Sequence, residues 1–369
     1  MTKKIGIVCT SPGFGGLEIY TLQLARSLSL KGWQLFFLLN EKSKLHQLAK
    51  KEFSVSSIQQ YQKEKNTASI IKNWNRAHQL SLLFTPYNKD IQPLSFYKRF
   101  YQKKIKLVYQ QHMKVGVKKR DFIHRLRYDM LDLWITPLAY LKEETLEKTT
   151  VTEDKIRIVP VGLSFDSFHG NKSQAEARQQ LQLPQDAYFI GILGRIDPKK
   201  GQDFLIKVMA SLQNESDIHL LLMGAATAYE GEEWMRYIQS LIAQYGLQER
   251  VHFRPYHEEV ALFYKAIDLF AMASHGETYG LVTLEAFYFE KPVIGVRTDG
   301  TKALLDDGRF GWLHAPEDVE GFKQHLFFIL HHPQQAQEKI RLAKQTVLEH
   351  YDFQTTVKRM ESLFVKLIS

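Results

Sequence analysis

Residues 269–290 read LFAMASHGETYGLVTLEAFYFE, and this stretch decides the fold class. It opens with a short apolar run that predicts a buried β-strand. A polar loop with two glycines follows, and beyond Gly280 apolar residues return at a spacing that predicts a helix over Val282–Phe289. Parallel α/β sheets are assembled from strand–loop–helix units of this kind. We therefore expect a doubly wound α/β fold around this stretch.

The same unit recurs along the whole chain, in two series. In the first series apolar runs predict strands, and helices such as Leu17–Leu30 fit between several of them. The first strands are Lys4–Cys9, Gln34–Leu39, Ser81–Thr85, Lys106–Gln110, Leu133–Thr136 and Arg157–Val161. The second series predicts strands at Tyr188–Leu193, His219–Met223, Val251–Arg254, Leu269–Ala273 and Pro292–Val296, and helices at Gln202–Ser211, Glu232–Tyr245, Glu258–Ala266 and Val282–Phe289.

The pattern restarts after Pro160-Val161-Gly162, which divides the chain into two domains. We expect residues 1–163 and residues 164–352 to form two Rossmann-like, doubly wound domains facing across a cleft. The last segment, Phe353–Ile368, predicts an amphipathic helix, and residues 353–369 are expected to pack back on the first domain. Ligands of such sheets bind beyond the carboxyl ends of the strands, and each motif below directly follows a predicted strand.

Composition is that of an ordinary globular protein, with 44% apolar and 24% charged residues. Cys9 is the one cysteine, so no disulfide can form within this sequence, which fits a reducing compartment. The basic start has too short an apolar run for a signal peptide, and no run of about 18 apolar residues occurs. We expect a cytoplasmic protein that can associate peripherally with the cytoplasmic face of the inner membrane.

Charge is unevenly distributed along the chain. Residues 1–157 carry 28 Lys and Arg against 13 Asp and Glu, whereas residues 158–369 carry 21 against 27. The first part therefore has a net charge of +15 and the second −6, which together give the +9 of the whole chain. This asymmetry predicts an acidic partner for the first part alone, such as anionic lipid, an acidic glycan or nucleic acid.

The first motif is a glycine-rich loop, Ser11-Pro12-Gly13-Phe14-Gly15-Gly16, between a predicted strand and its helix. Paired glycines let backbone N–H groups approach a ligand, and a helix N-terminus favours an anion. A tight strand-to-helix turn explains the same glycines equally well. The spacing departs from G-x-G-x-x-G, which argues against a dinucleotide-dependent oxidoreductase.

The second motif is the loop of residues 194–201, which holds the cations Arg195 and Lys200. Across the turn made by Asp197-Pro198, both can reach one diphosphate, Arg through a two-pronged contact and Lys as a point charge. The alternative is a surface loop whose charges are solvated.

The third and most specific motif spans residues 275–286. A helix that starts within it leaves free amides at Gly280 and Leu281 for phosphate oxygens. Glu285, about one turn into the helix, would repel a bare phosphate and instead suits a vicinal diol such as ribose. Glu277, before the helix, is placed for sugar hydroxyls, although an acid that complements the helix macrodipole is an alternative there.

Taken together, these loops resemble those of the family 4 retaining glycosyltransferases, which have the GT-B fold and belong to glycosyl transferases group 1. The likeness covers almost the whole chain. It rests on Gly15-Gly16, on Gly194-Arg195 with Lys200-Gly201, on the Glu-x7-Glu pattern from Glu277 to Glu285, and on the trailing Lys291-Pro292-Val293-Ile294-Gly295.

The resemblance implies a role for each matching residue. Arg195 and Lys200 would hold the diphosphate and steady the leaving group, while Glu277 would contact the transferred sugar. His112, which follows the strand ending at Gln110, would lie near that sugar, although a histidine at a strand end is otherwise more often structural. Gly16 would close over the donor, Glu285 would bind ribose, and the base would lie after the strand Val251–Arg254. The donor-binding set is thus Gly15, Gly16, Pro255, Tyr256, Val260, Thr278, Tyr279, Gly280, Leu281 and Glu285.

The implied reaction is transfer, with retention, of a hexose or N-acetylhexosamine from a nucleotide-diphosphate sugar that we expect to be UDP-linked. No Asp-x-Asp follows a strand and no His/Cys cluster has metal-ligand spacing, so we expect neither a metal nor another cofactor. Cations and helix amides would then stabilise the departing diphosphate. The chain departs from the family at Pro160-Val161-Gly162-Leu163-Ser164, where the family often has Pro-Asn-Gly-Val-Asp.

The basic residues of the first part form two clusters interleaved with aromatic residues, between Lys98 and Arg127. Such a surface suits an anionic membrane or an acidic acceptor, and a solvated face without a partner is the alternative. No nucleic-acid-binding signature accompanies it, so we expect no nucleic acid. The clusters are Lys98, Arg99, Lys103, Lys104 and Lys106, and then Lys114, Lys118, Lys119, Arg120, Arg125 and Arg127.

The acceptor expected from the resemblance is an envelope glycan or glycolipid, such as lipopolysaccharide core or capsule. Two other functions share the fold: a nucleotide-sugar epimerase, and a binding protein that has lost catalysis. A phosphorylase would need a cofactor lysine signature, which the sequence lacks. UDP-glucose, UDP-N-acetylglucosamine, UDP-galactose and GDP-mannose all remain open as donors.

Overall fold

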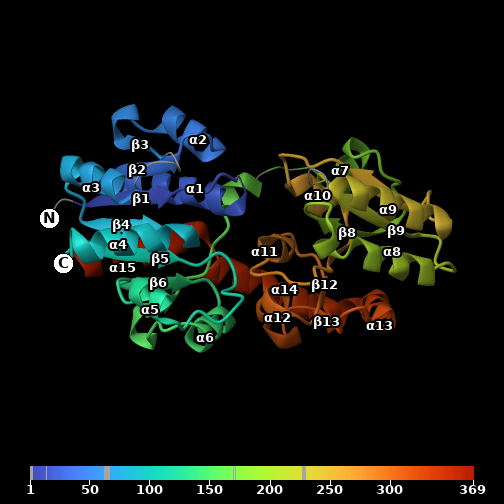
Figure 1. Ribbon diagram of the computed structural model, residues 1–369. Helices are drawn as coiled ribbons and strands as arrows, with labels where there is room; N and C mark the ends of the chain where they lie inside the picture. The colour runs from blue at the N-terminus through green and yellow to red at the C-terminus, as the bar shows by residue number, and fades with distance from the viewer. Residues whose placement is uncertain (1–2, 14, 62–66, 169, 171, 227–229) are drawn as a thin grey trace. The chain divides into compact units, whose positions relative to one another are not determined.

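The computed structural model describes residues 3–13, 15–61, 67–168, 170, 172–226 and 230–369 (Figure 1). Phe14 of the first glycine loop lies outside the described residues. The chain forms two compact units, which we call unit 1 (Met1–Pro160 with Gln354–Ser369) and unit 2 (Val161–Phe353). Each unit is a parallel sheet in which strands and helices alternate, so the expected pair of Rossmann-like domains is confirmed.

Unit 1 contains a seven-stranded parallel sheet in the order β3-β2-β1-β4-β5-β6-β7. The strand order reverses between β1 and β4, which makes that pair the switch point of the sheet. The strands are β1 (Lys4–Cys9), β2 (Gln34–Asn40), β3 (Ile58–Tyr61), β4 (Leu82–Thr85), β5 (Lys106–Gln110), β6 (Leu133–Thr136) and β7 (Ile156–Ile158). The helices are α1 (Gly16–Leu30), α2 (Lys44–Glu52), α3 (Thr67–His78), α4 (Ile91–Phe100), α5 (Phe122–Tyr128) and α6 (Ala139–Lys148).

The last helix, α15 (Phe353–Ile368), packs into unit 1 and is drawn in red among its blue and green elements in Figure 1. The Phe364 ring lies 5.9 Å from that of Trp33 and 5.7 Å from that of Phe84. Glu361 accepts hydrogen bonds from Trp33 Nε1 (3.2 Å) and Lys3 Nζ (3.1 Å). An apolar and a polar contact therefore hold the end of the chain on this sheet.

Unit 2 contains a six-stranded parallel sheet in the order β10-β9-β8-β11-β12-β13, with its switch point between β8 and β11. Its core is aliphatic and aromatic, with Phe204, Leu220, Leu222 and Phe322 all at least 98% buried. The strands are β8 (Tyr188–Leu193), β9 (Ile218–Met223), β10 (Val251–Arg254), β11 (Leu269–Met272), β12 (Val293–Val296) and β13 (Trp312–His314). The helices are α7 (Gln174–Gln180), α8 (Gln202–Ser211), α9 (Glu230–Gln244), α10 (Ala261–Ala266), α11 (Leu281–Tyr288), α12 (Asp299–Leu304), α13 (Val319–His331) and α14 (Pro333–His350).

The division between the units falls at residues 160/161 and 353/354, close to the expected 163/164 and 352/353. Leu163 N donates to Tyr351 O (2.7 Å) and Phe353 N donates to Leu163 O (2.9 Å). A Cβ on Gly162 would stand 2.6 Å from the Asp352 carbonyl carbon, so the two crossing segments meet backbone to backbone. Among the described residues, no helix is long and apolar enough to cross a bilayer.

Candidate functional site

Two loops follow the central strands of the unit 2 sheet, at the position where parallel sheets bind ligands. One follows β8 and comprises residues 194–201, and the other follows β11 and comprises residues 273–280. Because β8 and β11 are hydrogen-bonded neighbours at the switch point, both loops emerge side by side at one edge. The sheet topology thus brings the second and third sequence motifs together.

Close backbone contacts fix the loop after β8. A Cβ on Gly224 would lie 1.8 Å from Gly194 O, so only glycine allows these two strand ends to approach. Gly201 has φ +72°, and a Cβ there would lie 2.2 Å from Ala273 O. His275 N donates to Lys199 O at 3.0 Å, which joins the two loops directly. The second and third motifs are therefore one backbone platform.

On this platform Lys200 and Glu277 form an ion pair, with Nζ 2.8 Å from Oε2. The two side chains are 24% and 19% exposed, so the pair is partly shielded from solvent while remaining open to a ligand. Arg195 behaves differently: its side chain is 71% exposed, and its Nε lies 3.7 Å from Asp197 Oδ2. One cation is already held in place, and the other extends into solvent.

The N-terminus of α11 lies beside this pair. Gly280 adopts φ +86° as the N-cap residue, and a Cβ there would come within 3.1 Å of Glu277 Cγ. The first amides of a helix have no partner within the helix, and those at Gly280 and Leu281 are the predicted phosphate contacts. The Tyr279 hydroxyl instead donates to Val161 O (2.8 Å), so this buried side chain holds the start of the interdomain crossing. Thr278 is partly exposed, and its carbonyl lies close to α12: a Cβ on Gly300 would lie 2.7 Å from Thr278 O.

Glu285 lies one turn into α11 and contacts Tyr264 of α10. The Tyr264 hydroxyl is 2.8 Å from Glu285 Oε2 and 3.0 Å from Val282 O. Burial raises the pKa of the Glu285 carboxyl to about 7, and the hydrogen bond from Tyr264 partly opposes this effect. A protonated Glu285 can donate to Tyr264 while Tyr264 donates to Val282 O, so the arrangement accommodates the neutral acid. Tyr264 was not predicted, because nothing in the helical pattern of α10 identifies which aromatic residue faces α11.

The segment after β10 carries the predicted base site at Pro255, Tyr256 and Val260. Pro255 and Tyr256 are exposed, the latter by 58%, whereas Val260 is half-buried and directly precedes α10. Burial, followed by the negative charges of Glu285 and Glu258, raises the pKa of the Tyr256 phenol. Tyr256 therefore lies within electrostatic reach of Glu285, which brings the base and ribose candidates into one region.

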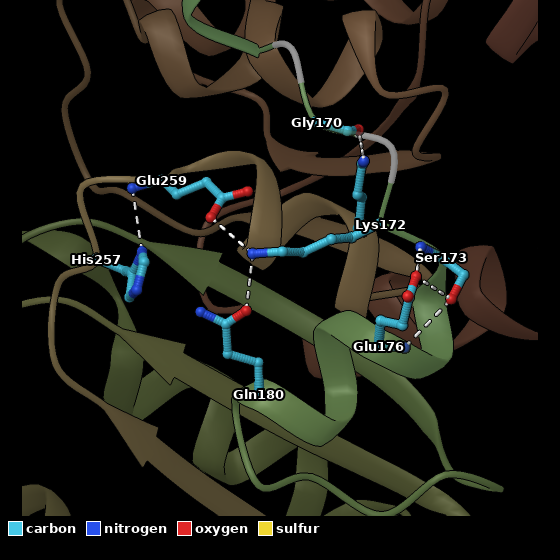
Figure 2. Close-up of polar contacts among 8 residues, drawn as sticks. Gly170, Lys172, Ser173, Glu176, Gln180, His257 and Glu259 are labelled. Atoms are coloured by element: carbon cyan, nitrogen blue, oxygen red, sulfur yellow. Dashed lines mark hydrogen bonds and ion pairs between the residues drawn. The ribbon is translucent and has the colours of Figure 1, made fainter.

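Figure 2 shows what holds the segment after β10 in place. Lys172 Nζ donates to Glu259 Oε2 (2.9 Å) and to Gln180 Oε1 (2.8 Å), which links the segment to α7. Glu259 N donates to His257 Nδ1 (3.0 Å), and this contact tightens the turn ahead of Val260. At the start of α7, Ser173 and Glu176 form a reciprocal capping box. The contact of Lys172 with Glu259 was not predicted, because the two residues lie 87 positions apart in the sequence.

Gly15 and Gly16 lie in unit 1, at the switch point after β1. Gly15 N donates to Glu18 Oε2 (2.9 Å) and α1 begins at Gly16. Neither glycine has a positive φ, and a Cβ on Gly16 would meet nothing within 4 Å. The backbone thus does not itself require glycine at position 16, which favours close approach of a ligand over the turn interpretation.

His112, also in unit 1, follows β5. Its ring packs edge-on against Tyr20, with centroids 5.4 Å apart. Its Nε2 is buried and has no hydrogen-bond partner among the described residues. Burial lowers the pKa of the imidazole to about 4, so the ring is neutral near pH 7 and can exchange hydrogen bonds with a hydroxyl.

The predicted basic surface is wrong at Lys98. This side chain is buried and forms an ion pair with Asp132, whose carboxylate also accepts from Leu107 N. Lys98 therefore stabilises the packing of α4 on the sheet and cannot face a membrane. Of the other cluster members, Lys103, Lys104, Lys118, Arg120 and Arg125 are exposed, and the rest are half-buried. Exposed apolar residues lie close to them in the sequence: Phe96, Phe100 and Tyr101 on and after α4, and Phe122 and Ile123 on α5.

Comparison with known proteins places the second motif and the third in one family segment. Residues 173–346, just under half of the chain, match the family described as Glycosyl transferases group 1. The matched residues contain all strands of unit 2 from β8 to β13, as well as Arg195, Lys200, Glu277 and Glu285.

Curated relatives match over a similar region. The D-inositol 3-phosphate glycosyltransferase of Corynebacterium jeikeium (strain K411) is 31% identical over 201 residues, which are 52% of this chain and 48% of that protein. The protein of the same name from Streptomyces scabiei (strain 87.22) is 32% identical over 180 residues, 47% of this chain and 40% of that one. The chain thus spans about half the length, or less, of these curated relatives.

Solved structures match over the full length. The glycosyltransferase of Rickettsia africae ESF-5 superposes with a TM-score of 0.87 and 18% identity, over 100% of this chain and 99% of that one. Anabaena HepE in complex with UDP gives a TM-score of 0.86 and 18% identity, over 98% and 100%. The fold of this chain is therefore that of the GT-B glycosyltransferases.

Proposed function

We propose that this chain is a family 4 retaining glycosyltransferase, which moves a hexose or N-acetylhexosamine from a UDP-linked donor to a glycan or glycolipid. The observation that carries the proposal is the Lys200–Glu277 ion pair beside the N-terminus of α11, at the switch point of the unit 2 sheet. The family match over residues 173–346 and the names of the curated relatives support it.

The phosphates of the donor would bind between Lys200, Arg195 and the amides of Gly280 and Leu281. A diphosphate that reaches Lys200 replaces the carboxylate of Glu277 as its partner, and Glu277 is then free to accept from sugar hydroxyls. As the glycosidic bond breaks, negative charge grows on the departing diphosphate, where these preorganised donors act. No metal or other cofactor is needed in this scheme.

The nucleoside would bind between Glu285 and the segment after β10. The ribose hydroxyls would donate to Glu285, which exchanges its contact with Tyr264 for two ligand contacts. The base would lie near Tyr256, with Pro255 and Val260 bordering it. In unit 1, Gly15 and Gly16 would let the protein backbone approach the donor closely, and the neutral His112 would contact a sugar hydroxyl.

The acceptor proposed is an envelope glycan or glycolipid, such as lipopolysaccharide core or capsule, reached from the cytoplasmic side of a membrane. Its support is the resemblance of the motifs together with the exposed aromatic residues of α4 and α5 and the exposed Arg125 of α5. An epimerase or an inactive binding protein would share donor binding but would leave the acceptor unglycosylated.

A nucleotide-sugar panel tests the donor site. A UDP-sugar at about 100 times its Kd should stabilise the fold by ~2.7 kcal/mol in a thermal-shift assay. Lys200→Ala should abolish most of this shift, whereas Lys199→Ala, an exposed lysine on the same turn, should retain it. The absence of any shift with UDP, GDP or their sugars would refute the proposed function. Donor hydrolysis or transfer, followed by product analysis, separates a transferase from an epimerase.

A further inference from the structure

Unit 1 holds a basic pocket that is lined in part by members of the second basic cluster. Its volume is about 340 Å³, and four cations line it: Lys89, Lys114, Lys119 and Arg127. His124 also lines it, and among the described lining residues there is no carboxylate. A pocket lined by four cations, with no carboxylate among its described lining residues, is suited to an anion.

The pocket lies at the carboxyl ends of two neighbouring strands of the sheet. Lys89 belongs to the segment after β4, and Gln111 and Lys114 belong to the segment after β5. The remaining wall is α5, which contributes His124 and Arg127. This is where a parallel sheet places ligands. His112, which we assign to the transferred sugar, lies in the same segment as Gln111 and Lys114.

One atom of the Arg127 guanidinium lacks a hydrogen-bond partner among the described residues. Its Nε is buried and has no hydrogen-bond partner among the described residues, which is an unusual state for a guanidinium group. Nearby carboxylates are engaged elsewhere: Glu144 binds Lys148 Nζ (2.8 Å) and Val115 N (3.1 Å), and Asp121 binds the ring of His124 (2.5 Å). A ligand oxygen would accept the hydrogen bond that Arg127 Nε does not make within the described residues.

Contacts with their neighbours fix several of the residues that line the pocket. The Trp134 ring packs on Tyr109 and Tyr128, with centroids 4.7 and 5.6 Å away. Gln111 Oε1 accepts from Trp134 Nε1 (3.0 Å) and from Thr145 Oγ1 (3.2 Å), which fixes the amide at the strand end. Lining residues that are held by such contacts need little rearrangement to bind a ligand, which favours a specific small anion over diffuse attraction.

We propose that this pocket is the acceptor subsite, and that it binds a phosphate carried by a sugar or polyol, whether free or lipid-linked. The lining residues of the pocket support an anion site by themselves, whereas the assignment of this site to the acceptor rests on the proposed function. Arg127 and Lys119 contact the phosphate, which leaves a hydroxyl of the same molecule near the segment that carries His112.

Calorimetric titration with glucose 1-phosphate, in saturating UDP so that the donor site is occupied, tests the pocket. Wild type should bind the phosphate ester and should not bind glucose under the same conditions. Arg127→Gln and Lys119→Gln should each weaken binding at least tenfold. The matched control is Arg125→Gln on the same helix, where the side chain is 68% exposed and does not line the pocket; its affinity should stay within twofold. Equal affinity in all variants, or no binding, overturns the proposal.

Two further measurements distinguish a lipid-borne phosphate from a free one, and a failure of this pocket from a failure of the proposed function. If the phosphate is lipid-borne, wild type should co-sediment with phosphatidylglycerol vesicles but not with phosphatidylcholine vesicles, and Arg127→Gln should lose this binding. If it is free, glucose 1-phosphate binds and the vesicles are ignored by every variant. UDP binding, measured first in each variant, reports folding and the donor site. A chain that binds glucose 1-phosphate through Arg127 but does not bind UDP would overturn the proposed function and retain the pocket as an anion site.

Discussion

The carboxyl of Glu285 should make the stability of the protein depend on pH in a direction opposite to that of most acidic residues. Burial raises its pKa from 4.5 to about 7 in the folded chain. Between these two values the folded state keeps a proton that the unfolded state releases, so unfolding becomes easier as pH rises. The difference between the two pKa values corresponds to ~3 kcal/mol of unfolding free energy. This stability is lost between pH 4.5 and pH 7, and the loss stays constant above pH 7.

Glu285→Gln isolates this contribution, because the amide keeps the shape of the neutral acid and cannot ionise. In urea denaturation at several pH values, the free energy of unfolding of the variant minus that of wild type should rise by ~3 kcal/mol from pH 4.5 to pH 8. Tyr264→Phe removes the hydrogen bond that opposes the rise in pKa, so it should move the titration of Glu285 to higher pH. A variant-minus-wild-type difference that stays flat across this range would refute the reasoning.

Three other changes test the platform, the ion pair and the corrected surface. Lys200→Ala should lower turnover by ~10²-fold with little change in Tm, as removal of a preorganised donor to the leaving group requires, and a turnover equal to that of Lys199→Ala would contradict the assignment. Gly201→Ala should destabilise the fold by more than Gly32→Ala, since both have positive φ but only Gly201 faces a backbone oxygen, at 2.2 Å from the added Cβ; chemical denaturation of the two variants compares them. Lys98→Ala should cost ~3 kcal/mol of stability, because Asp132 is left partly buried without its cation, and vesicle binding at low salt should not change. Loss of vesicle binding without loss of stability would show instead that Lys98 belongs to the exposed surface.

Most of the fold could be predicted from the sequence because its strands are buried on both faces. Lys4–Cys9, Lys106–Gln110, Leu133–Thr136 and Tyr188–Leu193 match their strands to the residue, and so does Val251–Arg254 at one edge of the unit 2 sheet. Two edge strands gave no such signal: β3 reads Ile-Gln-Gln-Tyr with its glutamines exposed, and β13 has only three residues. Burial on one face and short length remove the apolar run on which the prediction depends.

The candidate site was predicted in part, because only its local patterns are visible in the sequence. Glycine loops and the spacing of Glu277 and Glu285 are local patterns, so the sequence displays them directly. The partners of these residues are not local: Lys200 meets Glu277 across 77 positions, and Tyr264 meets Glu285 across 21. The burial of Lys98 could not be foreseen either, because Asp132 is 34 positions away and the sequence around Lys98 reads as a basic surface.

Main-chain hydrogen bonds between the loops at the edge of the unit 2 sheet affect how donor specificity can change. His275 N donates to Lys199 O and Gly300 N donates to Glu277 O, so main-chain bonds connect the segments after β8, β11 and β12 in sequence along the edge. The positions of the Cα atoms are then set by the backbone and are insensitive to which side chains they carry. Exchanging Arg195 or Thr278 should alter which donor is preferred while the docking frame stays where it is. A new specificity can therefore evolve here by point substitution, without a loop having to be rebuilt.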